Sequence, residues 1–174
     1  MRMRTSSCQA GLFLCFIAVL FVPFRLYAQN ITETQKLHFG RFIITDNNSI
    51  QTITVPAVDG GVAITSGGIA LLSDTQCAIY DLDGLLDMAN MPLTLRVNEI
   101  TGTTVMTRDG GGGGADFTIS NYTTSTPNSP DPTVVNPDGT ARIIIGATLE
   151  TTGISSDTYL GGGYTTTFNL TIDY

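Results

Sequence analysis

The sequence predicts an all-β domain of about nine short antiparallel strands, arranged as a sandwich or a barrel. Strand-favouring Thr, Ile and Val and turn-favouring Gly are abundant after the first 28 residues, whereas strong helix formers are scarce. Turn-forming clusters such as Asp46–Ser49 recur between short apolar segments. The last stretch, Tyr164–Tyr174, alternates between apolar and polar residues with a period of two.

The N-terminal 28 residues have the organisation of a secretory signal peptide. Arg2 and Arg4 precede an apolar run of fourteen residues, Gly11–Phe24, and Ala28 offers a small residue at a cleavage point. The alternative is an uncleaved membrane anchor, but a proline and an arginine end the apolar run below the length of about 20 residues that a spanning helix needs. We therefore expect residues 1–28 to be removed, leaving residues 29–174 as one domain.

The expected domain is strongly acidic. Five of the eight basic residues and all fifteen acidic residues lie in residues 29–174, which gives this part a net charge of −10. Such a surface repels nucleic acids and anionic lipids, and no second apolar segment has membrane-spanning length. We therefore expect no nucleic-acid partner and no membrane insertion after signal cleavage.

Short apolar or alternating segments between turn residues mark the individual strands. The expected strands are Leu37–Thr45, Ile50–Val55, Val62–Leu72 (with a bend at Gly67 and Gly68), Gln76–Tyr80, Leu93–Val97, Thr103–Thr107, Phe117–Ser120, Ala141–Leu149 and Tyr164–Tyr174. Ala141–Leu149 is almost continuously apolar, as in a strand covered on both faces. The glycine run Gly110–Gly114 is expected at a hairpin tip, and Thr123–Pro137, with four prolines, as an irregular surface loop. Asp81–Met91 is the one stretch expected to form a helical turn, because its leucines stand at helical spacing.

A catalytic constellation is not evident in the sequence. His38 is the single histidine and stands at the start of a strand, which favours a structural or surface role. No nucleophile elbow of the G-x-S-x-G type occurs. After residue 28 the one cysteine is Cys77, too few for a zinc site of Cys and His ligands. We predict that the protein is not an enzyme and has no cofactor and no catalytic residues.

Cys77 and an acidic segment leave two alternatives open. Cys77 is expected as a small buried hydrophobic residue, and the alternative is an intermolecular disulfide. The acidic segment Asp81-Leu82-Asp83-Gly84, with Asp87, is the best candidate for Ca²⁺, although its spacing does not match an EF-hand. An acidic turn is the favoured interpretation, so no metal site is predicted.

Three stretches resemble one bacterial family. They are Lys36–Phe42 (KLHFGRF), Asp116–Pro127 (DFTISNYTTSTP) and Asp138–Tyr174, which contains DGTARIIIGATLE and GGGYTTTFNLTIDY. In this order they resemble the domain-of-unknown-function 4402 family, whose members look similar to the spore-coat-protein-U-like subunits of chaperone–usher pili. The resemblance implies an immunoglobulin-like antiparallel β-sandwich, export, and no assigned catalytic residue.

The pilus likeness also implies partners and an interaction strand. In such pili a chaperone, and then the next subunit, adds a strand to an incomplete sandwich. The chaperone grips an alternating C-terminal strand that has a glycine about fourteen places from its end and an aromatic residue near the end. The residues of this chain that match are Gly161, Tyr164, Phe168, Leu170, Ile172 and Tyr174. The chain departs from the pattern at residues 29–36, where a donor segment would have alternating apolar residues and Ile31 is the single one.

Two functions from different classes are consistent with these features. The first is an exported structural or adhesive cell-envelope protein, of the pilus or fimbrial kind, assembled by strand complementation. The second is a self-sufficient secreted or envelope-associated binding module whose end loops, such as Thr123–Pro137, contact an unknown ligand. Either protein would reside in the periplasm, at the cell surface or outside a Gram-negative-type bacterium. A secreted enzyme is disfavoured, because no cluster of titratable residues suggests a catalytic cleft.

Overall fold

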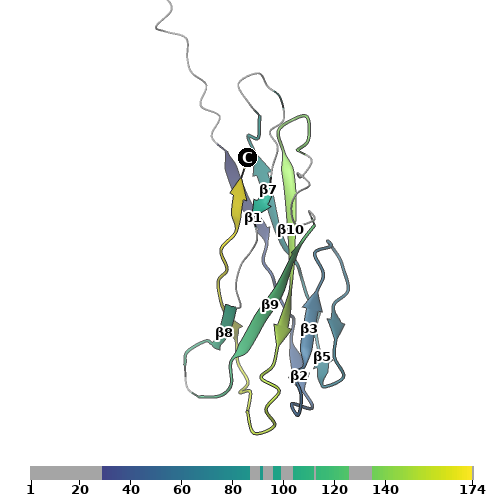
Figure 1. Ribbon diagram of the computed structural model, residues 1–174, viewed down its shortest axis with the longest axis vertical. Helices are drawn as coiled ribbons and strands as arrows, with labels where there is room; N and C mark the ends of the chain where they lie inside the picture. The colour runs from purple at the N-terminus through teal and green to yellow at the C-terminus, as the bar shows by residue number, and fades with distance from the viewer. Residues whose placement is uncertain are drawn as a thin grey trace, which may run out of the picture.

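The chain forms antiparallel strands along one long axis (Figure 1). The computed structural model describes residues 29–86, 91, 96–98, 104–111, 113–125 and 135–173. Within these residues no helix occurs, which confirms the all-β prediction. The strands are β1 (Asn30–Gln35), β2 (Phe42–Ile44), β3 (Thr52–Val55), β4 (Ile64–Thr65), β5 (Ile69–Leu71), β6 (Ala78–Asp83), β7 (Arg96–Asn98), β8 (Thr104–Arg108), β9 (Phe117–Thr124), β10 (Ala141–Glu150), β11 (Tyr164–Thr165) and β12 (Thr171–Asp173).

Strand β10 is the centre of the main sheet. One of its edges pairs first with β6, over Ala141–Ile145, and then with β3, over Ala147–Glu150, while the other edge pairs with β9. Most β10 side chains are buried. The apolar run in the sequence reflects this position, because β10 has a neighbouring strand on each edge and one face, with Ile143, Ile145 and Leu149, is fully buried. The other face is covered only in part, since Arg142 is exposed and Ile144 is half-buried.

Gly146 marks the point where β10 changes partner. A Cβ atom built on Gly146 would lie 2.6 Å from the backbone nitrogen of Ala57 and closer still to the carbonyl oxygen of Val55. These atoms belong to the end of β3 and the chain that follows it, so no side chain can be accommodated there. Glycine allows the backbones to approach and lets two different strands share one edge of β10.

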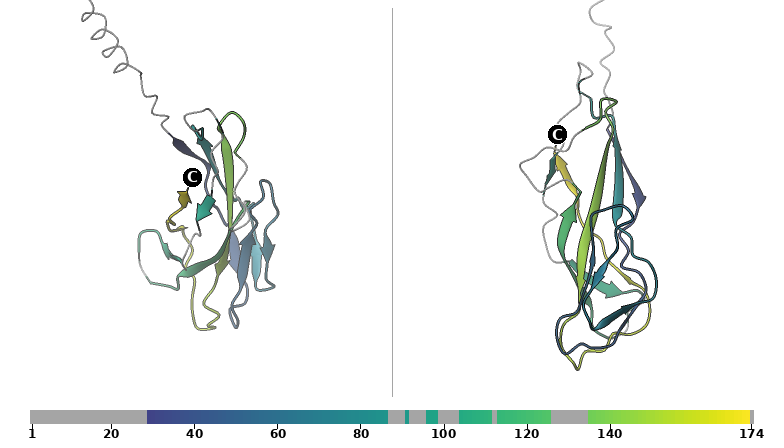
Figure 2. Two further views of the ribbon diagram at one scale, coloured as in Figure 1. Left: turned by 45° about the horizontal axis from the view of Figure 1, so that its top comes forward. Right: turned by 90° about the vertical axis from the view of Figure 1, so that its right-hand side faces the viewer.

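The lower part of the molecule curls into an interrupted ring (Figure 2). From β10 the pairing continues through β9 and β8 to β11 in one direction, and through β3 to β4 in the other. The two-stranded sheet β2–β5 follows β4, joined to it by a turn in which the Ile69 N–H donates to the Ser66 carbonyl. Among the described strands, none joins β11 to β2, so the ring is open at that position.

The core has two clusters, one in the lower and one in the upper part of the molecule. The lower cluster consists of Phe39, Ile53, Val55, Ile69, Cys77, Ile79, Phe117, Ile119, Ala147 and Leu149. The upper cluster consists of Ala78, Leu82, Leu85, Val135, Ala141, Ile143 and Ile145. Both include residues of β6 and β10, so these two strands join the two halves of the core. Cys77 is buried as expected, and burial raises the pKa of its thiol.

Strand β1 was not among the expected strands. It pairs antiparallel with β6 although all its side chains except Gln35 are exposed, Ile31 included. Backbone hydrogen bonds with β6 hold it, and the Gln35 amide adds a bond of 2.7 Å to the carbonyl oxygen of Cys77. Because neither face is covered, β1 lacks the apolar alternation by which a strand is usually recognised in a sequence.

Two expectations about local structure need correction. The helical turn expected at Asp81–Met91 is wrong for the described residues, because Asp81–Asp83 belong to β6 and the three residues after them are not helical. Leu82 is buried and pairs with both Ala141 and Ile31, so the ladder between three strands overrides the helical spacing of the leucines. Residues 87–90 lie outside the described residues.

The strand expected over Tyr164–Tyr174 is divided into β11 and β12. It first pairs with β8 and then with β7, and residues 166–170 between them have no assigned strand. The predicted alternation is nevertheless present, since Tyr164, Phe168 and Ile172 are half-buried while the residues next to them are exposed. This division, the division of Val62–Leu72 into β4 and β5, and the addition of β1 turn the nine expected strands into the twelve described ones.

In the described part of the chain, no helix has the length and apolar character needed to cross a membrane.

Replacing Gly146 with alanine tests the partner switch. We expect Gly146→Ala to lower the free energy of unfolding by about 1–3 kcal/mol, because the new methyl group would force apart backbones that have no free space. Urea unfolding followed by circular dichroism measures this change. Gly67→Ala is the matched control, since a Cβ at Gly67 meets nothing within 4 Å. Equal effects of the two substitutions would contradict the assigned role of Gly146.

An ion pair between β6 and β10 should make stability depend on acid pH. The Arg142 guanidinium bonds the Asp81 carboxylate with N–O distances of 2.7 and 3.1 Å and lowers the pKa of that carboxyl. Because the folded pKa lies below the unfolded one, the stabilisation is present above about pH 4 and is lost as the pH falls through the lower, folded value.

The urea midpoints of the wild type and Asp81→Asn should therefore differ slightly at pH 7 and converge as the pH falls below about 3. Asp83→Asn, at the exposed end of the same strand, is the control. The difference between its urea midpoint and that of the wild type should be the same at pH 7 and in acid. A difference that persists in acid would mean that the carboxylate charge is not the cause.

Candidate strand-accepting groove

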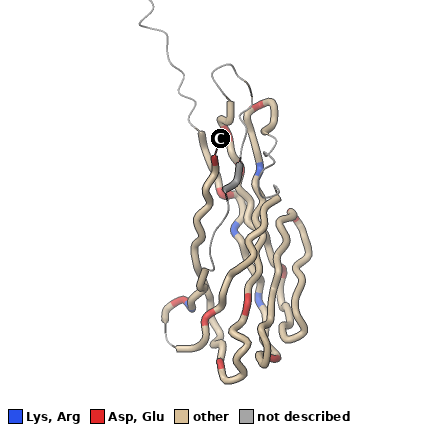
Figure 3. Tube along the Cα trace, in the orientation of Figure 1, with Lys and Arg blue, Asp and Glu red and all other residues tan. Residues whose placement is uncertain are grey.

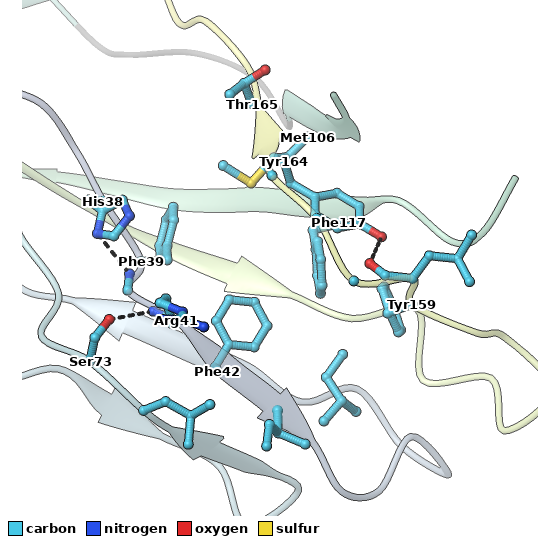
Figure 4. Close-up of a pocket in the computed structure, with 18 of the residues that line it drawn as sticks. His38, Phe39, Arg41, Phe42, Ser73, Met106, Phe117, Tyr159, Tyr164 and Thr165 are labelled. Carbon is cyan, nitrogen blue, oxygen red and sulfur yellow. Dashed lines mark hydrogen bonds between the residues drawn. The ribbon is translucent and has the colours of Figure 1, made fainter. Parts of the chain in front are cut away.

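A groove of about 1750 Å³ runs along the gap between β2 and β11 (Figure 4). The segment of residues 36–47, which includes β2, forms one side, and residues 157–166, which include the start of β11, form the other. Met106 of β8 and Phe117 of β9 contribute to its floor. The groove therefore occupies the open position of the ring.

Aromatic rings form a platform around Phe117. The Phe117 ring lies 4.4 Å from that of Tyr159 in a stacked arrangement, and 4.8 Å from Tyr164 and 5.5 Å from Phe42 in edge-to-face arrangements. The Tyr159 hydroxyl accepts a hydrogen bond of 2.7 Å from the Thr152 N–H. These contacts fix the rings, and the resulting surface suits aliphatic side chains better than ions.

The backbone edges on both sides of the groove have no partner strand in the described structure. The Leu72 N–H donates to the Arg41 carbonyl and the Thr45 N–H donates to the Gly68 carbonyl, so every second residue from Arg41 bonds β5. By the alternation of an antiparallel ladder, the N–H and C=O groups of Phe42 and Ile44 point away from β5, toward the groove. In the same way the Asp109 N–H donates to the Gly163 carbonyl, so the alternation assigns the bonds with β8 to Thr165 and directs the backbone groups of Tyr164 and Thr166 toward the groove. Such unpaired edges are templates for an additional strand.

The two bordering segments run in opposite directions. The chain descends from β1 to β2 and ascends from β11 to β12, as Figure 1 shows. A single strand between them must therefore be parallel to one neighbour and antiparallel to the other. Two adjacent parallel strands of one chain need a long crossover connection, whereas a strand from another chain needs none.

A kink before β2 shapes the side of the groove that β2 borders. Gly40 has a φ of +76°, and a Cβ atom on it would lie 2.7 Å from the carbonyl oxygen of Ser73. The next N–H, that of Arg41, donates to the Ser73 hydroxyl at 2.7 Å, and the Gly40 N–H donates to Nδ1 of His38 at 3.2 Å. Phe39 is thereby turned into the core. The groove-lining His38 has a structural contact here, consistent with the role expected for it.

The charges that line the groove are predominantly acidic. The charged side chains in the lining, apart from His38, are Lys36, Arg41, Asp46, Asp74, Asp109 and Asp157. Figure 3 shows the same tendency over the whole lower part of the molecule, where acidic positions outnumber basic ones. Asp109 is engaged by the Thr165 hydroxyl, which donates to its carboxylate.

The predicted interaction residues divide between two places. Gly161 and Tyr164 line the groove. Phe168, Leu170 and Ile172 instead pack against the upper core cluster, where the Phe168 ring lies 5.5 Å from that of Tyr122. Tyr174 lies outside the described residues.

Sequence reasoning missed most of the aromatic platform. Phe42, Met106 and Phe117 were expected as strand residues without a common site, and Tyr159 had no assigned role. Alternation in the sequence indicates which face of a strand is apolar, but not which strand it will lie beside. Only the tertiary contacts bring these residues together.

The acidic segment, the glycine run and Cys77 have structural roles. Asp81 is paired with Arg142, and among the described residues no group of three or more His, Cys, Asp or Glu side chains could hold a metal ion. Asp87 lies outside the described residues. Gly110, Gly111, Gly113 and Gly114 have positive φ values in the connection between the paired strands β8 and β9, as expected for a hairpin tip. Cys77 is 3% exposed, which leaves its sulfur little access to another chain.

Comparison with known families identifies the chain. The sequence model of a family described as "Domain of unknown function (DUF4402)" matches residues 30–174. The chain belongs to this family. The match begins at the first residue of β1 and covers all twelve described strands, so the groove lies entirely within the DUF4402 domain. No curated protein and no solved structure matches the chain significantly.

Truncating Phe117 tests whether the platform contributes to the core. Phe117 is 3% exposed and contacts three other rings, so Phe117→Ala should lower the free energy of unfolding by about 3–5 kcal/mol. Chemical unfolding measures the loss. Val105→Ala on the neighbouring strand β8 is the control; its side chain is 52% exposed, and a change within about 0.5 kcal/mol is expected. A small effect of Phe117→Ala would mean that the rings pack loosely.

Proposed function

We propose that this DUF4402 protein is an exported structural or adhesive subunit of the bacterial cell envelope, of the pilus or fimbrial kind, which is completed by a strand from another chain. The observation that carries the proposal is the groove between β2 and β11. It combines an apolar floor with two unpaired strand edges, the two features that β-strand addition requires.

The energetic argument is that the groove is costly to leave open. Backbone N–H and C=O groups along a sheet edge are satisfied by water only while the edge is solvated. The half-buried rings of Phe42, Tyr159 and Tyr164 leave apolar area on the floor that another surface would cover. A single inserted strand would pair with the edge groups and cover the aromatic platform. The C-terminal residues Gly161 and Tyr164 would contact the inserted strand, whereas Phe168, Leu170 and Ile172 pack against the upper core cluster and do not line the groove.

Export is part of the proposal. The signal-peptide pattern of residues 1–28 and the acidic composition of the remaining chain support a location in the periplasm, at the cell surface or outside the cell. A periplasmic chaperone and other subunits are the partners that this mode of assembly implies.

A self-sufficient binding module is the second candidate. The feature that favours it is the continuity of the core, because β6 and β10 join both hydrophobic clusters and β1 already covers the edge of β6. On this alternative the domain would be complete without any partner strand, and end loops such as Thr123–Pro137 would contact the ligand.

Strand addition can be tested with peptides. The full chain, produced in a host that exports it, is unfolded in urea with and without a capped peptide of about ten alternating Val and Thr residues. A peptide present at about 100 times its Kd should raise the free energy of unfolding by about 2.7 kcal/mol. The same peptide with a central proline, which cannot form a continuous strand, should have no effect.

A proline in the free edge should weaken this binding. Thr166→Pro removes an N–H that points toward the groove and makes no backbone bond in the described structure, so peptide affinity should fall about five- to tenfold. Thr166→Ala keeps the N–H and is the matched control. A monomeric protein with one cooperative transition that no strand peptide shifts would overturn strand addition and favour the binding module.

A further inference from the structure

The two ends of the strand-accepting groove differ in charge. Lys36 stands at the end next to β1, whereas Asp46 and Asp157 stand at the opposite end. The two aspartates belong to adjoining turns, because the side-chain amide of Asn47 donates to the Ile154 carbonyl at 2.7 Å and the Asp157 N–H donates to the same oxygen at 3.0 Å. We call this pair, Asp46 and Asp157, the acidic mouth of the groove.

The two ends act on an occupant independently. The chain from Lys36 to Asp46 is mostly extended, which places the ends roughly 30 Å apart at about 3.3 Å per residue. Charges at the surface are screened over about 8–10 Å at physiological ionic strength. A strand of about ten residues would therefore reach both ends, and the acidic mouth would select for a basic residue at the end of the strand that lies over it.

In the described part of the chain, no unpaired strand has a basic residue that could lie over the acidic mouth. Apart from Lys36 and Arg41, which line the groove, its basic residues are Arg96, Arg108 and Arg142. All three lie on strands that already have partners, namely β7, β8 and β10. Strand β1, which precedes the groove segment, is paired with β6. In addition, two copies of the domain repel each other, since residues 29–174 have a net charge of −10.

We propose that the strand that enters the groove belongs to a different protein and combines alternating aliphatic side chains with a basic residue placed over the acidic mouth. The aliphatic residues pack on the platform around Phe117, and the basic residue pairs with Asp46 and Asp157. This inference rests on the proposed strand addition and specifies its partner: assembly is heterotypic, between this acidic subunit and a protein with a basic, strand-forming segment.

Charged peptides test the identity of the partner. Four capped peptides of about ten residues share the alternating Val and Thr pattern, and each has either two Lys or two Glu residues, at either its first or its last positions. Fluorescence anisotropy of labelled peptides measures their affinity for the full chain. One of the two Lys peptides should bind about tenfold more tightly than either Glu peptide at about 0.05 M salt, and this preference should shrink at about 0.5 M salt.

Variants of the acidic mouth provide the matched comparison. Asp46→Asn combined with Asp157→Asn should reduce the preference for Lys to within about threefold while leaving the binding of an uncharged strand peptide unchanged. Asn at position 46 can still accept the bond that the Asn48 N–H now donates to Asp46. Asp74→Asn, which removes a lining carboxylate outside the mouth, is the control and should keep the preference.

The outcomes separate this inference from the function on which it rests. Binding of all strand peptides with equal affinity, or tighter binding of the Glu peptides, would overturn the basic partner and leave strand addition intact. If the purified chain forms linear multimers with itself through the groove, the heterotypic partner is overturned. If no strand peptide binds, both this inference and the proposed function fail.

Discussion

The pairing of β10 with two different strands along one edge is the constraint on which the rest of the fold depends. Ala141–Ile145 pairs with β6, Ala147–Glu150 pairs with β3, and Gly146 lets the backbones approach at the junction. Because residues of β10 enter both core clusters, the strand fixes the position of both halves of the domain. In the lower half the ladder from β10 places β9, β8, β11, β3 and β4, whereas β2 and β5 form a separate two-stranded sheet.

The groove is a consequence of this arrangement. The sheet curls outward from β10 and ends at β11 in one direction and at β4 in the other. The separate two-stranded sheet β2–β5 follows β4, and β2 borders the groove on the side opposite β11. Aromatic rings from β2, β9, β11 and the loop before β11 meet beneath the gap and make its floor apolar. The apolar floor and the unpaired edges therefore arise together, because no described strand pairs with both β2 and β11 across the gap.

In the proposed assembly, the acidic residues at one end of the groove determine how a bound strand is oriented and which strands bind, which an uncharged edge could not do. Burial of aliphatic side chains on the platform and pairing of backbone groups are available to any strand-forming segment, so they give affinity without choice. The acidic mouth distinguishes between segments by charge and works against association of identical subunits. In the proposed assembly, strand addition and partner selection depend on different residues of the same groove.

The sequence alone determined the elements whose signal is local, and the tertiary structure decided how they meet. The apolar run of β10, the alternation from Tyr164 to Ile172 and the glycine hairpin tip were predictable, because side-chain burial and backbone freedom leave a periodic or compositional trace. Strand β1 left no such trace, since both of its faces are solvated, and the leucines near Asp83 suggested a helical turn that the pairing of Leu82 overrides. The groove was not predictable, because Phe42, Phe117 and Tyr164 come from distant parts of the chain and meet only through the tertiary packing around the gap between β2 and β11.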